Sequence, residues 1–441
     1  MPDTEGPERK EPGKREFMRE KIVKQPLSKM QIAKRIAAFV CLAAVFGMIA
    51  AVSFVLSKPL ADRYLGQEIP EESSSIMFTK DEPDPALLES PADGTTAATA
   101  QQETQDVEEE ISKAMVEYDF STDNLNSMYN SVREVGQQAD KGIVTVRSGR
   151  QHMDLFGNPV ENTGDYAGIV IAKTSGEYLI FTYADAVKQA DSVSVTFFDG
   201  TEVMGASKQI DEVLGMAVVS VKTEDVKKDV ASDIKVLPLG NSYFAKSGDF
   251  IIGVGSPSGV VHSMAYGTIS CVVKNVRMID GMTRILYSDI HSNSRMGTFL
   301  LNTAGEVIGW CTDNYKSEDS RNAAVAVGIS DYKVTLEKMT NGVPAPYFGV
   351  KGQEVNQSMI ETGIPMGVYV TEAVSGSPAY DAGIQNGDII TLFGEKKITT
   401  FKELQVQIEN SESGFSVPVK VMRKSREGYK ELDYQVNIRA R

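Results

Sequence analysis

The chain has 441 residues, more than one ordinary domain holds, so two folded units with connecting segments are expected. Its formal net charge of -15 argues against a nucleic-acid partner, because phosphate binding depends on clustered Lys and Arg. The one dense basic region is the extreme N-terminus. The three histidines show no ligand spacing with each other or with the cysteines, so neither a metal nor a cofactor is expected.

The N-terminal part of the chain predicts a membrane anchor. Residues 36–57 form an uncharged apolar run, and a helix of about 20 such residues crosses a bilayer core. Acidic residues follow the run, which places the basic side in the cytoplasm and the C-terminal bulk outside the cell membrane. The preceding segment, residues 1–35, is expected to be disordered and carries Lys10, Lys14, Arg15, Arg19, Lys21, Lys24, Lys29, Lys34 and Arg35.

A cleaved signal peptide is the alternative for this run. The basic lead is long, and the apolar run exceeds the about 7 to 15 residues of a signal peptide, which favours the anchor. Residues 58–121 are acidic and rich in Ser, Pro, Thr, Ala and Gln, a composition that cannot bury enough apolar area to fold. They are expected to form a disordered tether.

Order is expected to resume at residue 122. Leu125, Met128, Tyr129 and Val132 repeat at helical spacing, and Gly136 is expected to end this helix. Many short β-rich runs follow, which indicates a sandwich or barrels. They are residues 143–147, 167–172, 178–182, 192–198, 217–221, 250–254, 268–273, 284–287, 299–302 and 307–311.

A second unit is predicted from residue 344 to residue 441. It mixes strands with one helix at residues 400–409. The expected strands are residues 367–371, 389–393, 417–423 and 430–438. This mixture predicts an α+β domain after a mainly β domain.

Three segments of the first unit form one ordered pattern: IFTYADAV at residues 180–187, VLGMAVV at 213–219 and LNTAGEVIG at 301–309. This pattern resembles the HtrA (DegP-like) branch of the trypsin-type serine proteases. In that family the first segment carries the catalytic His, the second carries the catalytic Asp, and the third is the strand, turn and strand that follow the nucleophile. The resemblance implies a trypsin-like double β-barrel over residues 122–341.

The second unit contains GVYVTEAVSGSPA at residues 367–379, AGI at 382–384 and NGDII at 386–390. In these segments it resembles a bacterial PDZ domain. The family therefore covers the chain from about residue 122 to residue 441, and an anchor followed by an acidic tether is similar to its membrane-bound members.

None of the catalytic positions carries the family's side chain. The family His falls on Asp185, the Asp on Gly215 and the nucleophilic Ser on Met296, in NSRMGT where the family has G-N-S-G-G. A thioether has no proton to lose, a carboxylate is a weak base at neutral pH, and glycine cannot orient a base. The sequence therefore predicts that the chain is not an enzyme.

A relocated active site is the alternative, because several candidate groups lie within a few residues of Met296. They are Asp289, His291, Ser292 and Ser294. In an extended stretch Asp289 and His291 would point to one side and Ser292 to the other, which argues against this alternative. His262 has no acidic neighbour in the sequence and is expected to be an ordinary loop histidine.

The PDZ-like unit keeps a plausible peptide site. In this family a peptide adds as a strand to the sheet, and backbone N–H groups of a loop hold its terminal carboxylate. YFGV, that is Tyr347, Phe348, Gly349 and Val350, resembles this loop. Leu404 and Ile408 share one face of the predicted helix and are expected to line the groove; the alternative is that they only fill the core.

Together these features predict a membrane-anchored, extracytoplasmic HtrA-like pseudoprotease that acts by PDZ-mediated binding of peptides or protein C-termini. It would be a scaffold, sensor or regulator in envelope protein quality control. The resemblance implies homo- or hetero-oligomers with HtrA-type relatives, commonly trimers. The rivals are an active endopeptidase with a relocated site and a structural envelope protein with a closed groove. Pairing of Cys271 with Cys311 stays open.

Overall fold

The computed structural model describes residues 75–81, 121–153, 159–316 and 323–441. The basic segment 1–35, the predicted transmembrane helix 36–57 and most of the predicted tether lie outside these residues. In the described part of the chain, no helix combines the length and the apolar character needed to cross a membrane.

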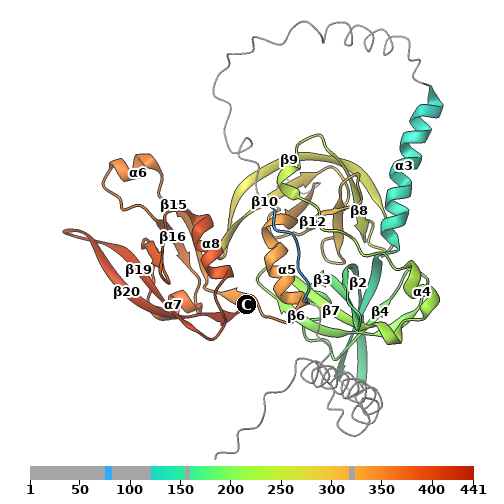
Figure 1. Cartoon of the computed structure of the whole chain (residues 1–441), viewed down its shortest axis with the longest axis horizontal. Helices are drawn as coiled ribbons and strands as arrows, with labels where there is room; N and C mark the ends of the chain where they lie inside the picture. The colour runs from blue at the N-terminus through green and yellow to red at the C-terminus, as the bar shows by residue number, and fades with distance from the viewer. Residues whose placement is uncertain (1–74, 82–120, 154–158, 317–322) are drawn as a thin grey trace, which may run out of the picture. The chain divides into compact units, whose positions relative to one another are not determined.

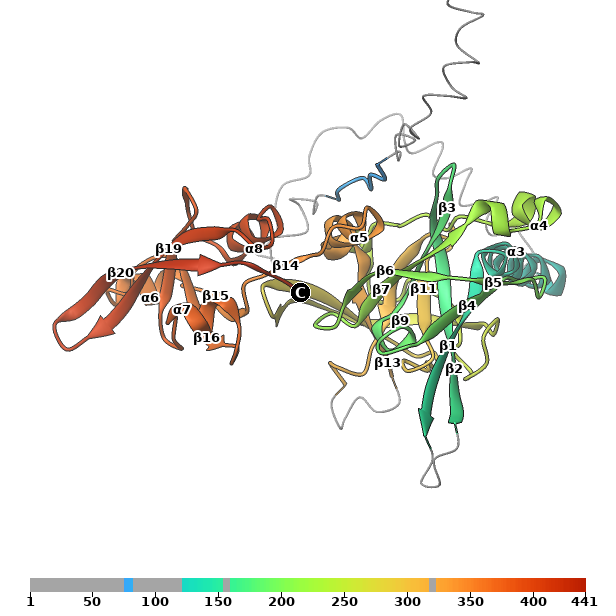
Figure 2. The same cartoon turned by 90° about the horizontal axis from the view of Figure 1, so that it is seen from below.

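The first half of the peptidase-like unit is a seven-stranded antiparallel sheet with strand order β5-β4-β1-β2-β3-β7-β6. Strands β1 and β2 run far beyond their neighbours and project as a two-stranded ribbon (Figure 2). The strands are β1 Ile143–Met153, β2 Pro159–Lys173, β3 Glu177–Tyr183, β4 Ser192–Thr196, β5 Glu202–Met204, β6 Ala206–Asp211 and β7 Met216–Lys222.

The second half is a closed six-stranded barrel with order β10-β13-β12-β11-β8-β9. Its strands lie together beneath the long β9 in Figure 1. They are β8 Phe250–Gly255, β9 Ala265–Met278, β10 Gly281–Ser288, β11 Thr298–Leu301, β12 Val307–Cys311 and β13 Ala324–Gly328.

Strand β3 lies between two hydrophobic cores, which explains its nearly continuous apolar sequence. Successive side chains of a strand point to opposite faces. Tyr178 and Ile180 pack in the core of the first sheet, whereas Leu179 and Phe181 pack in the core shared with the barrel. There the Phe181 ring lies 5.4 Å from that of Phe299, centroid to centroid. This shared core fixes the two halves against each other.

The ten strand runs predicted for this unit each coincide with an observed strand. Three strands were missed. Strands β5 and β6 lie at opposite edges of the sheet, β5 has three residues and β6 is mostly polar, and β13 is a short Ala-Val run. Neither β5 nor β6 has the apolar pattern on which the prediction depended, whereas β13 is apolar and was missed.

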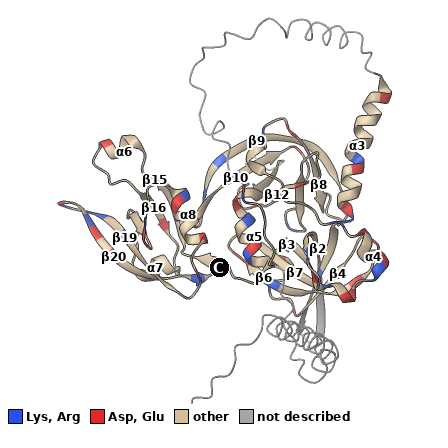
Figure 3. Ribbon diagram, in the orientation of Figure 1, with Lys and Arg blue, Asp and Glu red and all other residues tan. Residues whose placement is uncertain are grey.

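Helix α3, Thr122–Asp140, is longer than predicted. It does not end at Gly136, because that residue is buried where the helix meets the β8–β9 segment; an added Cβ would lie 2.8 Å from the sulfur of Met264. The glycine serves close packing rather than termination. Charged residues of both signs are spaced along the helix (Figure 3). Other helical elements are α4 Lys228–Asp233, α5 Lys333–Thr340, and the short 3-10 turns η2 Ala184–Ala186, η3 Thr223–Asp225, η4 Ser242–Phe244 and η5 Ile329–Tyr332.

Residues 75–81 correct the prediction of a wholly disordered tether. Ile76 and Phe78 pack against the shared core. The side chain of Asn341 both accepts from the Ile76 N–H (3.0 Å) and donates to the Ile76 carbonyl (2.8 Å). Asp81 pairs with the buried Lys333 at 2.9 Å. Two apolar side chains, hydrogen bonds and one ion pair dock this polar segment on the peptidase unit, which the overall composition does not reveal.

The C-terminal domain is a PDZ-type sheet with order β15-β16-β17-β19-β20, and β18 pairs with β17. Its strands are β14 Pro346–Tyr347, β15 Val350–Glu354, β16 Val368–Ala373, β17 Ile389–Phe393, β18 Lys396–Lys397, β19 Ser416–Ser425, β20 Gly428–Asn437 and β21 Arg439–Ala440. Its helices are α6 Gln357–Glu361, α7 Pro378–Ala382 and α8 Phe401–Glu409. Thr400 and Glu403 form a capping box that starts α8 one residue later than predicted.

Candidate functional site

Two of the three family positions meet in one cleft. Strand β3 ends at Tyr183, and η2 presents the exposed Asp185 directly after it. Gly215 lies in the turn before β7, and its carbonyl accepts the N–H of Ala184 at 3.0 Å. These residues line a cavity of about 390 Å³ together with the loop at residues 294–295. The folded chain therefore has a cleft where the resemblance places an active site.

Met296 is in the loop between β10 and β11, next to this cleft. It is half-buried and does not line the cavity, and its carbonyl accepts the N–H of Ala167 at 2.6 Å. The backbone here ties the loop to the first sheet. The side chain brings no ionisable group to the cleft.

The backbone N–H groups near Met296 already have an acceptor. The side-chain oxygen of Asn293 accepts from the N–H of Arg295 (3.2 Å) and from that of Met296 (3.1 Å). An oxyanion hole needs such N–H groups to be aimed at the reacting oxygen. In this structure they are aimed at a side chain of the same loop.

Tyr183 holds this loop in place, and sequence reasoning missed it. The ring is buried, and its hydroxyl lies 3.0 Å from the carbonyl of Thr298, 2.8 Å from that of Cys311 and 3.2 Å from the Thr298 nitrogen. Burial raises the pKa of the Tyr183 hydroxyl well above its usual value, so it stays protonated. Only its position two residues before Asp185, at the end of a buried strand, could have suggested this role.

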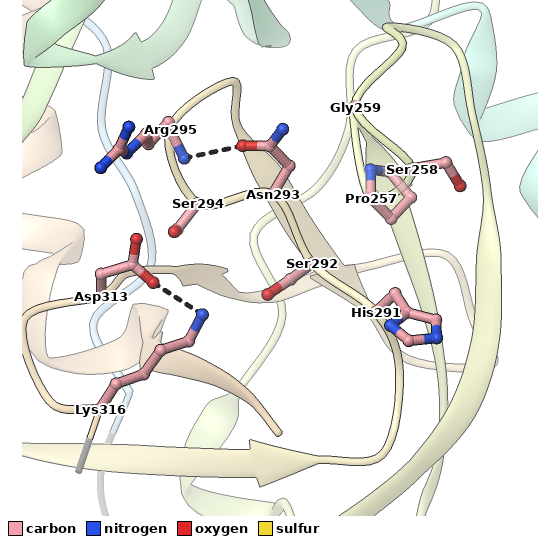
Figure 4. Close-up of a pocket in the computed structure, with 10 residues that line it drawn as sticks. All are labelled: Pro257, Ser258, Gly259, His291, Ser292, Asn293, Ser294, Arg295, Asp313 and Lys316. Atoms are coloured by element: carbon pink, nitrogen blue, oxygen red, sulfur yellow. Dashed lines mark hydrogen bonds and ion pairs between the residues drawn. The ribbon is translucent and has the colours of Figure 1, made fainter. Parts of the chain in front are cut away.

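A second cavity of about 510 Å³ adjoins the first, and residues 294–295 and Asp313 line both. It gathers three of the four groups considered for a relocated active site, namely His291, Ser292 and Ser294, whereas Asp289 accepts from Thr268 instead. Figure 4 shows His291 on the side of Pro257, with Ser294 and Asp313 on the opposite side. Partial burial raises the pKa of the Asp313 carboxyl, but hydrogen bonds from Lys316 and Ser294 outweigh burial and lower it.

This arrangement differs from a Ser-His-Asp relay, in which the imidazole lies between the serine and the acid. Ser294 contacts Asp313 directly instead. Ser292 contacts the thiol of Cys311, whose pKa burial raises to about 12. Cys271 and Cys311 are both free, the first exposed and the second buried.

His262 does have an acidic partner, contrary to the prediction. Its Nδ1 lies 3.0 Å from a carboxylate oxygen of Asp140, at the end of α3. The two residues are 122 positions apart in the sequence, so inspection of neighbouring residues could not find the pair. Among the residues placed by the structure, no group of three His, Cys, Asp or Glu side chains could hold a metal ion.

The loop predicted to bind carboxylates does surround a carboxylate. The N–H groups of Phe348, Gly349 and Val350 donate to the side chain of Asp280, at 2.8, 2.7 and 2.9 Å. Gly349 has φ +89°, and an added Cβ would lie 2.1 Å from that of Ser377. The Ser377 hydroxyl donates to the Gly349 carbonyl at 3.1 Å. The loop is thus a rigid cradle of three convergent donors.

The helix face predicted to line the groove is fully buried. Leu404 and Ile408 are 0% and 1% exposed and belong to the core of the domain, as the alternative interpretation had it. Their contact with a peptide stays a prediction. Sequence reasoning missed Gln405, whose side-chain oxygen accepts the N–H of Met282 at 3.4 Å.

Comparison with known proteins agrees with this architecture. Residues 167–309 match the family described as trypsin-like peptidase domain, and residues 346–436 match the PDZ domain family. The "HtrA-type protease AlgW with decapeptide" shares the fold, with a TM-score of 0.50, 16% identity, and coverage of 70% of this chain and 98% of that one. The chain thus joins a trypsin-like peptidase domain to a PDZ domain.

The curated relatives that match the chain are named as serine proteases. "Serine protease Do-like HtrA" of Bacillus subtilis is 25% identical over 71% of this chain and 74% of its own length. "Serine endoprotease DegS" of Haemophilus influenzae is 25% identical over 69% and 86%. The "probable periplasmic serine endoprotease DegP-like" of Hahella chejuensis is 28% identical over 64% and 60%. Over its peptidase and PDZ domains the chain is therefore similar to the HtrA-like, PDZ-containing proteases.

These names contradict the prediction that the chain is not an enzyme. The matching relatives are named as serine proteases, so the loss of three side chains does not decide against peptidase activity. The prediction assumed that only the three triad positions could supply catalytic groups. Any activity of this chain requires groups other than Asp185, Gly215 and Met296, because these cannot form a triad.

We expect Tyr183→Phe to destabilise the peptidase domain by about 1–3 kcal/mol, because it leaves buried backbone groups of the 298 and 311 positions without a partner. Urea unfolding of the full chain, followed by the fluorescence of the single Trp310, measures this loss. The control Tyr129→Phe removes a hydroxyl from a side chain that is 58% exposed, and should change stability by less than about 0.5 kcal/mol. Equal unfolding midpoints for the two variants would contradict the assigned role.

Proposed function

We propose that this protein binds the C-terminal ends of peptides or proteins through its PDZ domain. One observation carries the proposal: three backbone N–H groups of the loop at residues 348–350 converge on a carboxylate. Hydrogen bonds to a charged acceptor are about twice as strong as neutral ones. Strand β15 follows the loop at the edge of the sheet, where an extended peptide can add as a further strand.

The biological setting we propose is the outer side of a cell membrane. The support is the apolar run at residues 36–57 between basic and acidic segments. The Hahella chejuensis relative is named as probably periplasmic, which is in keeping with this setting. There the protein would act as a scaffold, sensor or regulator in envelope protein quality control, alone or in oligomers with HtrA-type relatives.

Amidation of a ligand's C-terminus should weaken binding by at least about tenfold, because it removes the charge that the three N–H groups accept. The probe is a set of decapeptides with apolar last residues, each made with a free or an amidated C-terminus. Fluorescence anisotropy with the full chain gives the two affinities.

The matched variants for this test are Gly349→Ala and Gly363→Ala. Both glycines have positive φ, but an added Cβ meets Ser377 in the first and nothing within 4 Å in the second. We expect only Gly349→Ala to abolish the preference for a free carboxylate. Acid and amide peptides that bind the wild type equally well would refute the proposed function.

Deletion of residues 36–57 should move the protein from the membrane fraction to the supernatant after alkaline extraction, because it removes the one long apolar run. Deletion of residues 85–106, of the same length and from the acidic segment, should leave it in the membrane. Retention of the first deletion variant in the membrane fraction would contradict an anchor at residues 36–57.

A second candidate function is serine endopeptidase activity with a relocated nucleophile. The observation that favours it is Ser294, which lines both cavities and donates to Asp313. The names of the relatives point in the same direction. Because no imidazole lies between these two groups, turnover should fall far below that of a triad enzyme, for which losing one member costs about 10⁴ to 10⁶ in rate.

A fluorophosphonate probe, together with digestion of unfolded casein, tests this candidate. Labelling of the full chain should disappear in Ser294→Ala and persist in Ser258→Ala, a serine that lines only the larger cavity. The variant Ser292→Ala tests whether Ser292, the other possible nucleophile of this loop, is the labelled residue. Labelling that survives both Ser292→Ala and Ser294→Ala would rule out a nucleophile in this loop.

A further inference from the structure

The carboxylate in the PDZ loop belongs to the peptidase domain of the same chain. Asp280 is the last residue of the two-residue turn between β9 and β10, and its side chain is 3% exposed. One oxygen accepts from Phe348, and the other accepts from Gly349 and Val350. All three donors of the loop are therefore taken up by a residue distant in sequence.

The backbone of Asp280 also pairs as a bound peptide would. Its N–H donates to the carbonyl of Val350 at 2.8 Å, so Val350 donates to the side chain and accepts from the main chain of one residue. Val350 begins the edge strand β15. A peptide that adds to this edge makes the same kind of main-chain pairing, and its terminal carboxylate enters the same cradle.

The two strands of the hairpin contact both sides of the groove. Strand β9 contacts β15, and β10 contacts α8. Met282 packs against the hydrophobic core of the PDZ domain. The buried Gly281 approaches Gln405 so closely that an added Cβ would lie 3.1 Å from its side chain. The hairpin thus contacts the edge strand and the helix at the same time.

Turn geometry alone does not require an aspartate at this position. Asp280 has φ +62°, a conformation that glycine and asparagine also adopt readily. Neither of those residues supplies a carboxylate. Burial of the ionised group has a cost, since it raises the pKa of the Asp280 carboxyl in spite of Arg441 nearby and the three N–H donors. The contact of Asp280 with the loop is therefore specific. Because burying its carboxylate is unfavourable, a ligand can displace it.

We propose that the β9–β10 hairpin is an internal ligand of the PDZ groove, with Asp280 standing in for the terminal carboxylate of a peptide. A chain end from another protein binds only when the hairpin leaves. This inference rests on the proposed function and adds its regulation. An external ligand needs a free C-terminal carboxylate, because it must replace a charged acceptor with one of equal strength.

Competition of this kind has a calculable effect. The apparent dissociation constant of a peptide equals its intrinsic constant divided by the fraction of molecules with an open groove. A covalently attached competitor acts at an effective concentration of the order of millimolar. If the hairpin is docked in about 90–99% of molecules, peptides bind about 10- to 100-fold more weakly than they would to an empty groove.

The variant Asp280→Asn tests the proposal with little change of shape. Asparagine keeps the turn conformation, but it loses the charge and turns an amide toward three N–H donors. Free-acid decapeptides should bind the full-length variant at least about tenfold more tightly than the wild type. The control Asp199→Asn makes the same change in another turn, where Asp199 accepts from Thr201, and should alter affinity less than about twofold.

Hydrogen exchange of the amides at residues 348–350 is the second measurement, and Asp280→Gly is a second variant that suits the turn. Both variants should speed exchange about tenfold without peptide, and free-acid peptide should restore protection. Unchanged exchange, or equal peptide affinity of Asp280→Asn and wild type, would overturn the internal ligand while leaving peptide binding intact. If no form of the protein prefers free-acid peptides, the proposed function falls, and the competition falls with it.

Discussion

Backbone N–H groups in sharp turns need an acceptor, and this requirement shapes both candidate sites of the protein. The loop at residues 295–296 and the loop at residues 348–350 each aim two or three N–H groups at one point. A buried N–H without a partner costs about 1–3 kcal/mol. In each loop a side chain of the same chain meets that need, Asn293 in the first and Asp280 in the second.

The rest of the fold holds these two loops in position. Tyr183 bonds β11, which follows the first loop, and the neighbouring strand β12 from within the shared core, where the ring also packs on Phe299 at 5.7 Å between centroids. Ser377 supports the second loop from the start of α7. Both supports are buried, so neither loop can relax its donors outward without disturbing a core. The donors stay aimed whether or not a ligand is present.

Much of the fold could be predicted from the sequence, because strands such as β3 and β8 are apolar runs between turn residues, and α8 has helical spacing with a capping box. The docked segment at residues 75–81 and the Asp140–His262 pair could not, because each depends on contacts across more than a hundred positions. The carboxylate loop was located by resemblance. Its occupant, Asp280, gives no signal in the sequence, since an aspartate in a turn is common for local reasons.

The two occupied loops differ in what can replace the occupant. Asn293 offers a neutral amide oxygen to the N–H groups of the first loop. A negatively charged oxygen that enters the cleft is a stronger acceptor, so it is favoured to replace the Asn293 oxygen. Asp280 already offers a full charge, so exchange of one carboxylate for another is nearly neutral. The outcome in the groove is then set by the remainder of the ligand, through strand pairing with β15 and contacts with α8. The same need for an acceptor therefore makes binding in the cleft depend on the charge of the ligand, and binding in the groove depend on the sequence of the ligand.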